Sequence, residues 1–130
     1  LSDNEKALRN YYSEVLNFTR TSSALMGEYL ELHTFNRKLN LAYTDKTFAF
    51  ARWDKDQKLL VVTNFDEHKS VNTILHLSPE LLKAWNLKPG TRELKEQLFG
   101  KKTTQLDVDE KGAHIELILG PWESAVFEVK

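Results

Sequence analysis

Hydrophobic positions follow two different periods along this chain, and the change between them falls near Gly27. Over residues 7–18 the apolar side chains recur at helical spacing and cover an arc of roughly 180°, against the ~100° stripe of a helix that packs on one surface. From residue 28 onward the period falls to two, which is typical of strands. The pattern therefore predicts one N-terminal helix followed by a β domain.

The N-terminal helix has a clear start and an unusually broad apolar surface. Ser2-Asp3-Asn4-Glu5 has the form of a capping box, and a stretch rich in hydroxyls after Arg20 predicts the end of the helix near that residue. Because the arc is so wide, we expect one edge to pack on the β domain and the other to need a second neighbour. The residues of this arc are Ala7, Leu8, Tyr11, Tyr12, Val15, Leu16 and Phe18.

Alternating segments fill the rest of the chain. Residues 47–53 and 58–65 are apolar on both faces and flank a four-residue turn, so they predict a hairpin of central strands in a sheet that is covered on both sides. Residues 79–87 predict a short helix, since Ser78 can cap it and Pro79 suits its first turn. The other strands are expected at 28–33, 70–77, 92–100, 102–109, 113–119 and 123–130.

These elements predict a mainly β fold: an antiparallel β-sandwich of Greek-key type preceded by one α-helix. The order of strands along the chain is also compatible with a jelly roll. Residues 92–100 have a helical composition, but their position between turns favours a strand. The sequence shows no internal repeat and no linker, so we expect a single sandwich after the helix.

Composition and charge narrow the classes of partner. The chain has 130 residues, 18 Lys and Arg against 19 Asp and Glu, and a net charge of -1, so it has no strong field to attract nucleic acid or an anionic membrane. No window approaches 18 consecutive apolar residues, so neither a membrane span nor a signal peptide is expected in this sequence. The absence of cysteine excludes disulfides and thiolate metal sites and leaves the compartment open.

Metal-ligating chemistry finds little support in the sequence. The four histidines have no metal-ligand spacing. Two acidic turns resemble the start of a calcium loop, but Lys58 and Lys111 stand at ligand positions, and Ile118 occupies the place of the bidentate Glu. We therefore expect no metal and no cofactor in this chain.

Catalytic motifs are also missing from the sequence. No serine lies in a nucleophile elbow, no glycine-rich phosphate loop occurs, and the acidic residues fall mainly in turns and on outward strand positions. A free-standing sandwich enzyme is the least supported interpretation, because no acid, base or nucleophile set converges.

Aromatic side chains are the one feature with a plausible binding interpretation. Sugar rings have apolar faces that stack on exposed aromatics, so a carbohydrate platform could form from the candidates below. The alternative is that these rings pack in or cap the sandwich core. The candidates are Trp85, Trp122, Trp53 and Tyr43.

Four segments, in order, resemble the α-amylase family of enzymes (glycoside hydrolase family 13). "LRNYYSEVLNFTRTSSALMGEY" is similar to the stretch that closes that family's catalytic barrel and leads into its C-terminal domain. "FAFARWDKDQKLLVVTNFDE" is similar to a pair of strands ending in Asn-Phe, and "RELKEQLFGKK" to an Asp-Leu-Leu-x-Gly-Lys segment. "GPWESAVFEVK" is similar to the closing Pro-aromatic-x-Ala strand, so the resemblance spans nearly the whole chain.

The resemblance implies a non-catalytic C-terminal domain of an α-glucan-cleaving glycosidase, whose role is to stabilise a (β/α)8 barrel. Residues 1–26 would be the helix and connection inherited from that barrel, and residues 27–130 the sandwich. The family's catalytic Asp and Glu lie on the barrel, and none of those motifs occurs here, so we expect no activity from this chain alone. The first residue is Leu, which agrees with a piece of a longer, processed or exported parent.

The implied partner is the barrel of the same polypeptide, and in the isolated chain a second copy could cover the same helix edge. We expect the open edge to be formed either by Ala7, Tyr11 and Phe18 or by Tyr12 and Leu16. The alternative function is a carbohydrate-binding module for starch or a related glucan that acts through the surface aromatics.

Overall fold

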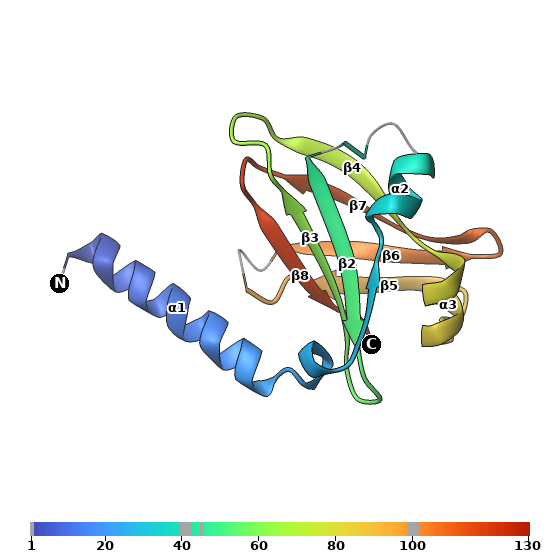
Figure 1. Ribbon diagram of the computed structural model, residues 1–130, viewed down its shortest axis with the longest axis horizontal. Coiled ribbons are helices and arrows are strands. Elements are labelled where there is room, and N and C mark those ends of the chain that lie inside the picture. Colours follow the sequence, from blue (N-terminus) through green and yellow to red (C-terminus); the bar gives the residue numbers. More distant parts are fainter. Residues whose placement is uncertain (1, 40–42, 45, 99–101) are drawn as a thin grey trace.

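Two four-stranded antiparallel sheets face each other, and a long helix projects from one side of them (Figure 1). The computed structural model describes residues 2–39, 43–44, 46–98 and 102–130, without the side chains of residues 8, 11, 12 and 15. The elements are α1 (Asp3–Thr21), the 3-10 helix η1 (Ser23–Met26), β1 (Glu28–Glu31), α2 (His33–Leu39), β2 (Thr47–Trp53), β3 (Lys58–Asn64), β4 (Val71–Leu77), α3 (Pro79–Trp85), β5 (Gly90–Lys95), β6 (Thr103–Asp109), β7 (Gly112–Leu119) and β8 (Ser124–Glu128).

The strand order confirms the predicted Greek-key sandwich. The first sheet has the order β1-β2-β3-β8 and the second the order β4-β7-β6-β5. In the second sheet β5, β6 and β7 form a meander. β4, which α3 connects to β5, lies on the far side of the meander beside β7, and this is the Greek-key arrangement. Of the segment expected as a strand over residues 92–100, the first part forms β5, because pairing with β6 satisfies its backbone, and the strand ends at Lys95.

The core lies between the inner faces of the two sheets. Strict alternation along β4 and β7 turns every second side chain inward, as a half-buried strand requires. The fully buried side chains of this layer include Leu32, Leu60, Leu75, Leu94, Leu106 and Ile115. Burying side chains of this size stabilises the fold by roughly 1.5–3 kcal/mol each.

One helix was missed by the sequence pattern. The strand expected over residues 28–33 stops at Glu31, and α2 begins at His33. Thr34 donates its backbone N–H to the Glu31 carboxylate at 3.0 Å, which satisfies one of the free donors at the start of α2. Seven residues are too few to show a helical period beside the long alternating run, so a hydrophobic pattern alone does not reveal α2.

Asn36 on α2 closes the outer edge of β4. Its buried side chain donates to the carbonyls of His76 and Leu32, each at 2.9 Å, and accepts from the His76 N–H at 2.8 Å. Toward His76 the Asn36 amide presents one donor and one acceptor, as a residue of a neighbouring strand would, so Asn36 takes the place of a further strand there. This matters because unpaired edge groups are costly when buried and prone to pair with other chains.

Glu96 does the same for the edge of β8. Its carboxylate accepts from the backbone N–H groups of Val126 and Leu98, both at 2.8 Å. The neighbouring Gln97 N–H donates to the Val126 carbonyl at 2.8 Å. The end of β5 and the edge of β8 are therefore joined, and the sandwich is closed on that side.

The capping box at the start of α1 is present. Ser2 accepts from the Glu5 N–H at 3.2 Å, and its hydroxyl donates to the Glu5 carboxylate at 2.9 Å. The helix ends at Thr21, one residue beyond the expected end. None of the helices in the described residues is long and apolar enough to cross a membrane.

The last turn of α1 and η1 pack on the outer face of the first sheet. Phe18 is half-buried against a small cluster of Ala24, Leu59 and Val126. The side chain of Gln57, in the β2–β3 hairpin, accepts from the Ala24 N–H at 3.1 Å. The rest of α1 extends away from the sandwich (Figure 1), so only its C-terminal end is anchored.

Gly27 lies where the chain passes closest to β2. A Cβ built on it would overlap the carbonyl oxygen of Trp53, a backbone atom that cannot move without shifting the strand. We predict that Gly27→Ala lowers the free energy of unfolding by roughly 2 kcal/mol or more, since overpacking of this kind costs about 1–3 kcal/mol. Thermal denaturation measures the change.

Gly120→Ala is the matched control for this prediction. At Gly120 the nearest atom to an added Cβ is Oε2 of Glu123, the end of a flexible side chain, at 3.2 Å. The loss of stability should therefore be clearly smaller than for Gly27→Ala. Equal losses for the two variants would contradict the argument from the close backbone approach.

Candidate functional site: an aromatic outer face

The outer face of the first sheet carries several apolar side chains. Phe48 and Phe50 alternate with the inward-facing Ala49 and Ala51 along β2, so both rings point outward. Register places Val61 beside Phe50 and Tyr29 beside Arg52. We call this group, with two residues beyond the strand ends, the aromatic face: Tyr29, Phe48, Phe50, Val61, Phe65 and Trp122.

The rings of the aromatic face contact one another. Tyr29 and Phe50 have ring centroids 5.5 Å apart, and Phe48 and Phe50 lie 6.1 Å apart. The guanidinium of Arg52 lies 5.7 Å from the centroid of the Tyr29 ring and donates to the Leu25 carbonyl at 2.6 Å. These contacts hold the rings in place beside the anchored end of α1.

Phe65 and Trp122 extend the aromatic face beyond the ends of β3 and β8. The hydroxyls of Thr63 and Ser124 lie 2.9 Å apart on the outer face. Phe65 comes two residues after Thr63 and Trp122 two residues before Ser124, at the same end of this antiparallel pair. Their rings meet edge to face at 6.2 Å. They remain 50% and 61% exposed, so the apolar surface here has no cover within the described residues.

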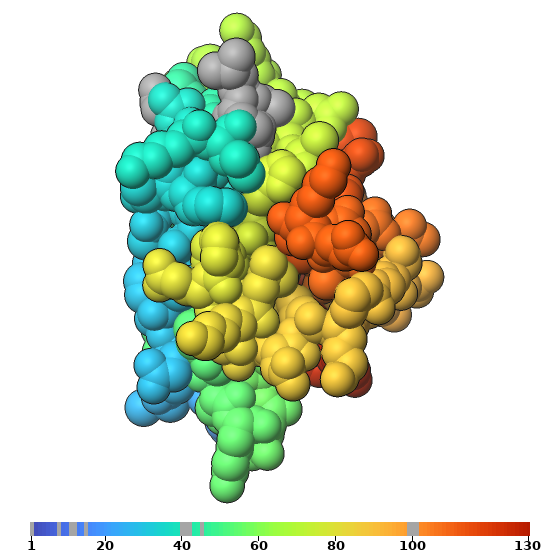
Figure 2. All heavy atoms as spheres, turned by 90° about the vertical axis from the view of Figure 1, so that its right-hand side faces the viewer, coloured from blue at the N-terminus to red at the C-terminus, as the bar shows by residue number. Residues whose placement is uncertain are grey.

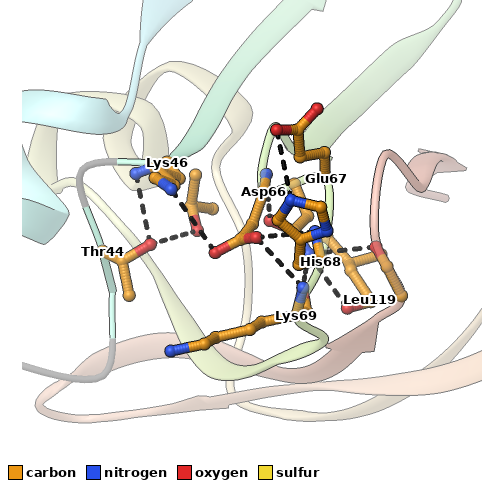
Figure 3. Close-up of polar contacts among 10 residues, drawn as sticks. Thr44, Lys46, Asp66, Glu67, His68, Lys69 and Leu119 are labelled. Carbon is orange, nitrogen blue, oxygen red and sulfur yellow. Dashed lines mark hydrogen bonds and ion pairs between the residues drawn. The ribbon is translucent and has the colours of Figure 1, made fainter.

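A network of hydrogen bonds positions this end of the face (Figure 3). The buried Asn64 amide donates to the carbonyls of Lys69 at 2.9 Å, Gly120 at 3.0 Å and Leu119 at 3.3 Å. The backbone N–H of Trp122 donates to the Asp66 carbonyl at 3.1 Å, and the backbone φ of Trp122 is 57°. A left-handed backbone is costly for a bulky residue, so the network holds Trp122 in a position that it would not adopt alone.

Asp66 organises the loop between β3 and β4. Its carboxylate accepts from the N–H groups of His68 at 2.9 Å and Lys69 at 3.0 Å, and Lys46 lies 3.7 Å away (Figure 3). The hydrogen bond from the His68 N–H, with that from Lys69 and the charge of Lys46, lowers the pKa of Asp66. The ionised carboxylate is therefore the form that this loop favours.

The outer face of the second sheet is different in character. Its outward positions alternate with the core residues of β4 and β7 and are mainly polar, including Asn72, His76, His114 and Glu116. Burial, with the nearby His114, lowers the pKa of His76. Two apolar side chains, Ile74 and Ile118, lie among these polar neighbours. The asymmetry between the two faces makes the outer face of the first sheet the candidate functional site.

The structure separates the four aromatic residues proposed as a carbohydrate platform. Tyr43 is buried, with its hydroxyl 3.2 Å from the His33 ring, and Trp85, the last residue of α3, is also buried. Trp53 is half-buried edge to face against Trp85, with 5.9 Å between ring centroids. Trp122 is the one of the four with a largely exposed ring, so these residues do not form a shared platform.

The open edge of α1 is partly described. Leu16 is 68% exposed and Ala7 is also exposed, whereas Phe18 packs on the sandwich. The side chains of Tyr11 and Tyr12 lie outside the described residues. Of the two edges expected to remain open, the described residues therefore show Leu16 exposed on one, and on the other Ala7 exposed and Phe18 packed on the sandwich.

The sequence pattern predicts the outward apolar side chains of β2 and β3, but it does not show that part of this face remains exposed. Residues 47–53 and 58–65 are apolar on both faces, and β2 and β3 are indeed the central strands of the first sheet. The expectation that this sheet is covered on both sides is met in part: the outward side chains of β2 and β3 are buried or half-buried, whereas Tyr29, Phe65 and Trp122 beside them are exposed. The last turn of α1 and η1 cover only the part around Leu59 and Val126.

The molecule is thus an antiparallel Greek-key sandwich with one solvated and one apolar outer face. Residues 40–130 match the family described as the α-amylase C-terminal all-beta domain, and the chain belongs to this family. The resemblance seen in the sequence is therefore confirmed.

Solved structures of amylases share the fold. A crystal structure of an Anoxybacillus α-amylase is 17% identical, with a TM-score of 0.63, and the match covers 95% of this chain and 22% of that one. AmyP E221Q in complex with maltotriose is 14% identical, with a TM-score of 0.66 over 100% of this chain and 22% of that one. AmyP in complex with maltose is 15% identical, with a TM-score of 0.62 over 98% and 21%.

The chain spans about a fifth of the length of these amylases. At such identities the likeness shows the fold. A comparison with curated proteins gives no match.

The ionised Asp66 carboxylate gives the loop below Trp122 a distinct pH dependence. Because the pKa of Asp66 is lowered, its stabilisation is present above the ordinary value of 3.8 and is lost as the pH falls through the lower folded-state value. We predict that the amide resonances of His68 and Lys69 titrate below the ordinary Asp range, and that Asp66→Asn abolishes this titration.

Asp109→Asn serves as the control for the loop experiment. Asp109 accepts from two backbone N–H groups in the β6–β7 turn, as Asp66 does in its own loop. This variant should leave the titration of His68 and Lys69 unchanged. Persistence of the titration in Asp66→Asn would contradict the assignment.

Proposed function

We propose that this chain is the non-catalytic C-terminal domain of an α-amylase-like glycosidase that acts on α-glucans, and that its aromatic face docks on the catalytic barrel and stabilises it. The observation that carries the proposal is the aromatic face itself, which lies on the same sheet that anchors the end of α1. In this proposal α1 is the last helix of the barrel, and the face beside it meets the rest.

The length and the shape of the chain support a barrel as the occupant. The amylases that share its fold are about five times longer, since the chain spans 21–22% of them. The N-terminal part of α1 extends away from the sandwich, with Leu16 exposed, as expected for a helix whose neighbours are elsewhere in the parent (Figure 1). In this proposal the exposed part of α1 and the aromatic face together form one docking surface.

The energetics favour a stabilising role. Tyr29, Phe65 and Trp122 are about half exposed, and covering the exposed half of each ring, roughly 75–125 Å², would contribute about 2–3 kcal/mol at about 25 cal/mol per Å². The neighbouring half-buried rings are already ordered by mutual contacts, so little side-chain entropy is lost on docking.

The non-catalytic part of the proposal is supported by the state of the carboxylates. A cavity of about 400 Å³ is lined by residues of β6, β7 and β8 and by three carboxylates, Glu96, Glu116 and Glu123. Glu96 accepts from two backbone N–H groups. Glu123 accepts from Lys102 at 2.6 Å and from the Gly120 N–H at 3.1 Å. These two groups have structural partners, so they are poorly suited to act as a free acid and base.

The docking proposal predicts a difference between the two outer faces. In the full-length parent, Tyr29→Asp should shorten the half-life of thermal inactivation several-fold, because it buries a charge in the contact with the barrel. Ile118→Asp, at a 64% exposed position on the opposite face, should change the half-life little. Residual α-glucan hydrolysis after heating measures both.

The same two substitutions in the isolated chain separate docking from local stability. Both positions are exposed there, so thermal denaturation should change by a similar small amount. A parent in which Ile118→Asp is as damaging as Tyr29→Asp would refute the proposed docking face. Turnover of soluble starch by the purified isolated chain would refute the non-catalytic role.

The second candidate function is a carbohydrate-binding module that uses the exposed corner of Trp122 and Phe65. The edge-to-face rings provide a flat apolar face with a side wall, which suits a stacked sugar ring. If the docking proposal holds, migration of the chain through starch gels should equal migration through starch-free gels, and Trp122→Ala should change nothing.

Tyr29→Ala is the control for the gel experiment, since Tyr29 is an equally exposed aromatic away from Phe65 and Trp122. Retardation by starch that is lost in Trp122→Ala and retained in Tyr29→Ala would favour the binding module instead. Retardation lost in neither variant would place glucan binding elsewhere on the chain.

A further inference from the structure

Two histidines far apart in the sequence face each other on the solvated side of the second sheet. His76 on β4 is the register partner of His114 on β7, and both side chains point away from the core. Their ring centroids lie 6.0 Å apart with an interplanar angle of 41°. This is a pair created by strand register, which the spacing along the chain does not reveal.

The hydrogen bonds of His76 define the type of cross-strand pair. Its N–H and carbonyl both bond to the side chain of Asn36, on the outer edge of β4, and so point away from β7. His76 and His114 therefore form a non-hydrogen-bonded antiparallel pair. In such pairs the Cα atoms are about 4.5 Å apart, closer than in the hydrogen-bonded type, and the side chains run side by side.

The surroundings leave ring nitrogens available. His114 has Nε2 at 3.7 Å from the Asp107 carboxylate, which in turn accepts from the Thr91 hydroxyl at 2.8 Å. Because Nε2 of His114 faces Asp107, Nδ1 is the nitrogen of this ring that remains to bind a ligand. Within the described residues, no hydrogen-bond partner is seen for either ring nitrogen of His76.

A shallow cavity adjoins the pair. It has a volume of about 280 Å³, and both histidines line it with Phe35 of α2 and Leu82 of α3. Figure 2 shows α2, α3 and the β6–β7 hairpin side by side on this side of the molecule. The apolar walls limit competition from bulk water on one side, while the open side admits a small ion.

We propose that His76 and His114 together bind one divalent transition ion of the Zn²⁺, Ni²⁺ or Cu²⁺ class, with water completing its coordination. Imidazole nitrogen suits these ions. Within the described residues no group of three or more His, Asp and Glu side chains is arranged to hold a metal, so this is an open site with two protein ligands. It differs in this from a closed structural zinc site.

The observed ring separation is compatible with chelation after a small adjustment. Two Zn–N bonds of about 2.0–2.1 Å at a tetrahedral angle bring imidazole centroids to roughly 5 Å. The rings at 6.0 Å must therefore approach by about 1 Å, which rotation of the two exposed side chains can provide without moving the sheet. Asp107 acts as a positioning residue that orients the His114 ring.

Zinc titration of the tag-free protein tests the site, with calorimetry for affinity and the histidine ring resonances for location. We expect one Zn²⁺ per chain and shifts of the His76 and His114 rings. His76→Gln and His114→Gln should each weaken binding at least tenfold, because either removes one of the two ligands. Asp107→Asn should weaken binding less, with the thermal stability of the metal-free protein unchanged.

His68→Gln is the matched control, because His68 is an exposed histidine that faces Glu67 at 3.3 Å rather than another imidazole. It should retain wild-type affinity. Zinc binding that survives in the His76→Gln, His114→Gln double variant, or that is lost in His68→Gln, would overturn the proposal. The site lies on the sheet opposite the aromatic face, so its failure would not bear on the docking proposal.

Discussion

The buried layer between the two sheets is the interaction on which everything else in this molecule depends. Alternation along β4, β6 and β7 turns their apolar side chains toward β2, β3 and β8, and the leucines at the centre, with Ile115, exclude water. The layer leaves each sheet with a second, outer face. Because one outer face is polar and the other aromatic, the same packing that stabilises the domain also decides which side remains to be covered.

Two of the four edge strands, β4 and β8, are closed by side chains rather than by extra strands. Asn36 satisfies both backbone groups of His76, and Glu96 accepts the N–H of Val126. A buried amide or carboxylate in such a position is held because losing it would strand buried backbone groups. Closure of this kind protects the strand edges against pairing with another chain, and it leaves the aromatic face as the main apolar surface of the sandwich.

In the loops at the end of the first sheet, hydrogen bonds of buried polar groups position the exposed residue Trp122. The Asn64 amide donates to three backbone carbonyls, Asp66 accepts from the N–H groups of its own loop (Figure 3), and the Trp122 backbone, with φ 57, donates to the Asp66 carbonyl. An exposed ring fixed by buried polar groups has already lost its conformational freedom, so it can contact a partner at little further entropic cost. The arrangement serves docking or stacking equally well, which is why only measurement separates the two functions.

The sequence by itself determined the type of structure and the family. Period-two alternation, the capping box at Ser2 and the turn residues act over a few neighbours, so the helix, the short α3 and eight strands could be predicted within one to three residues at most ends. The residues of β5 have a helical composition, but their position between turns correctly favoured a strand. The tertiary structure decided what depends on register and packing between distant segments: the burial of Tyr43 and Trp85, the pairing of Phe65 with Trp122, and the meeting of His76 with His114. Side chains that meet across strands share no local pattern, since their distance in space is set by the order of strands in the sheet and not by their spacing along the chain.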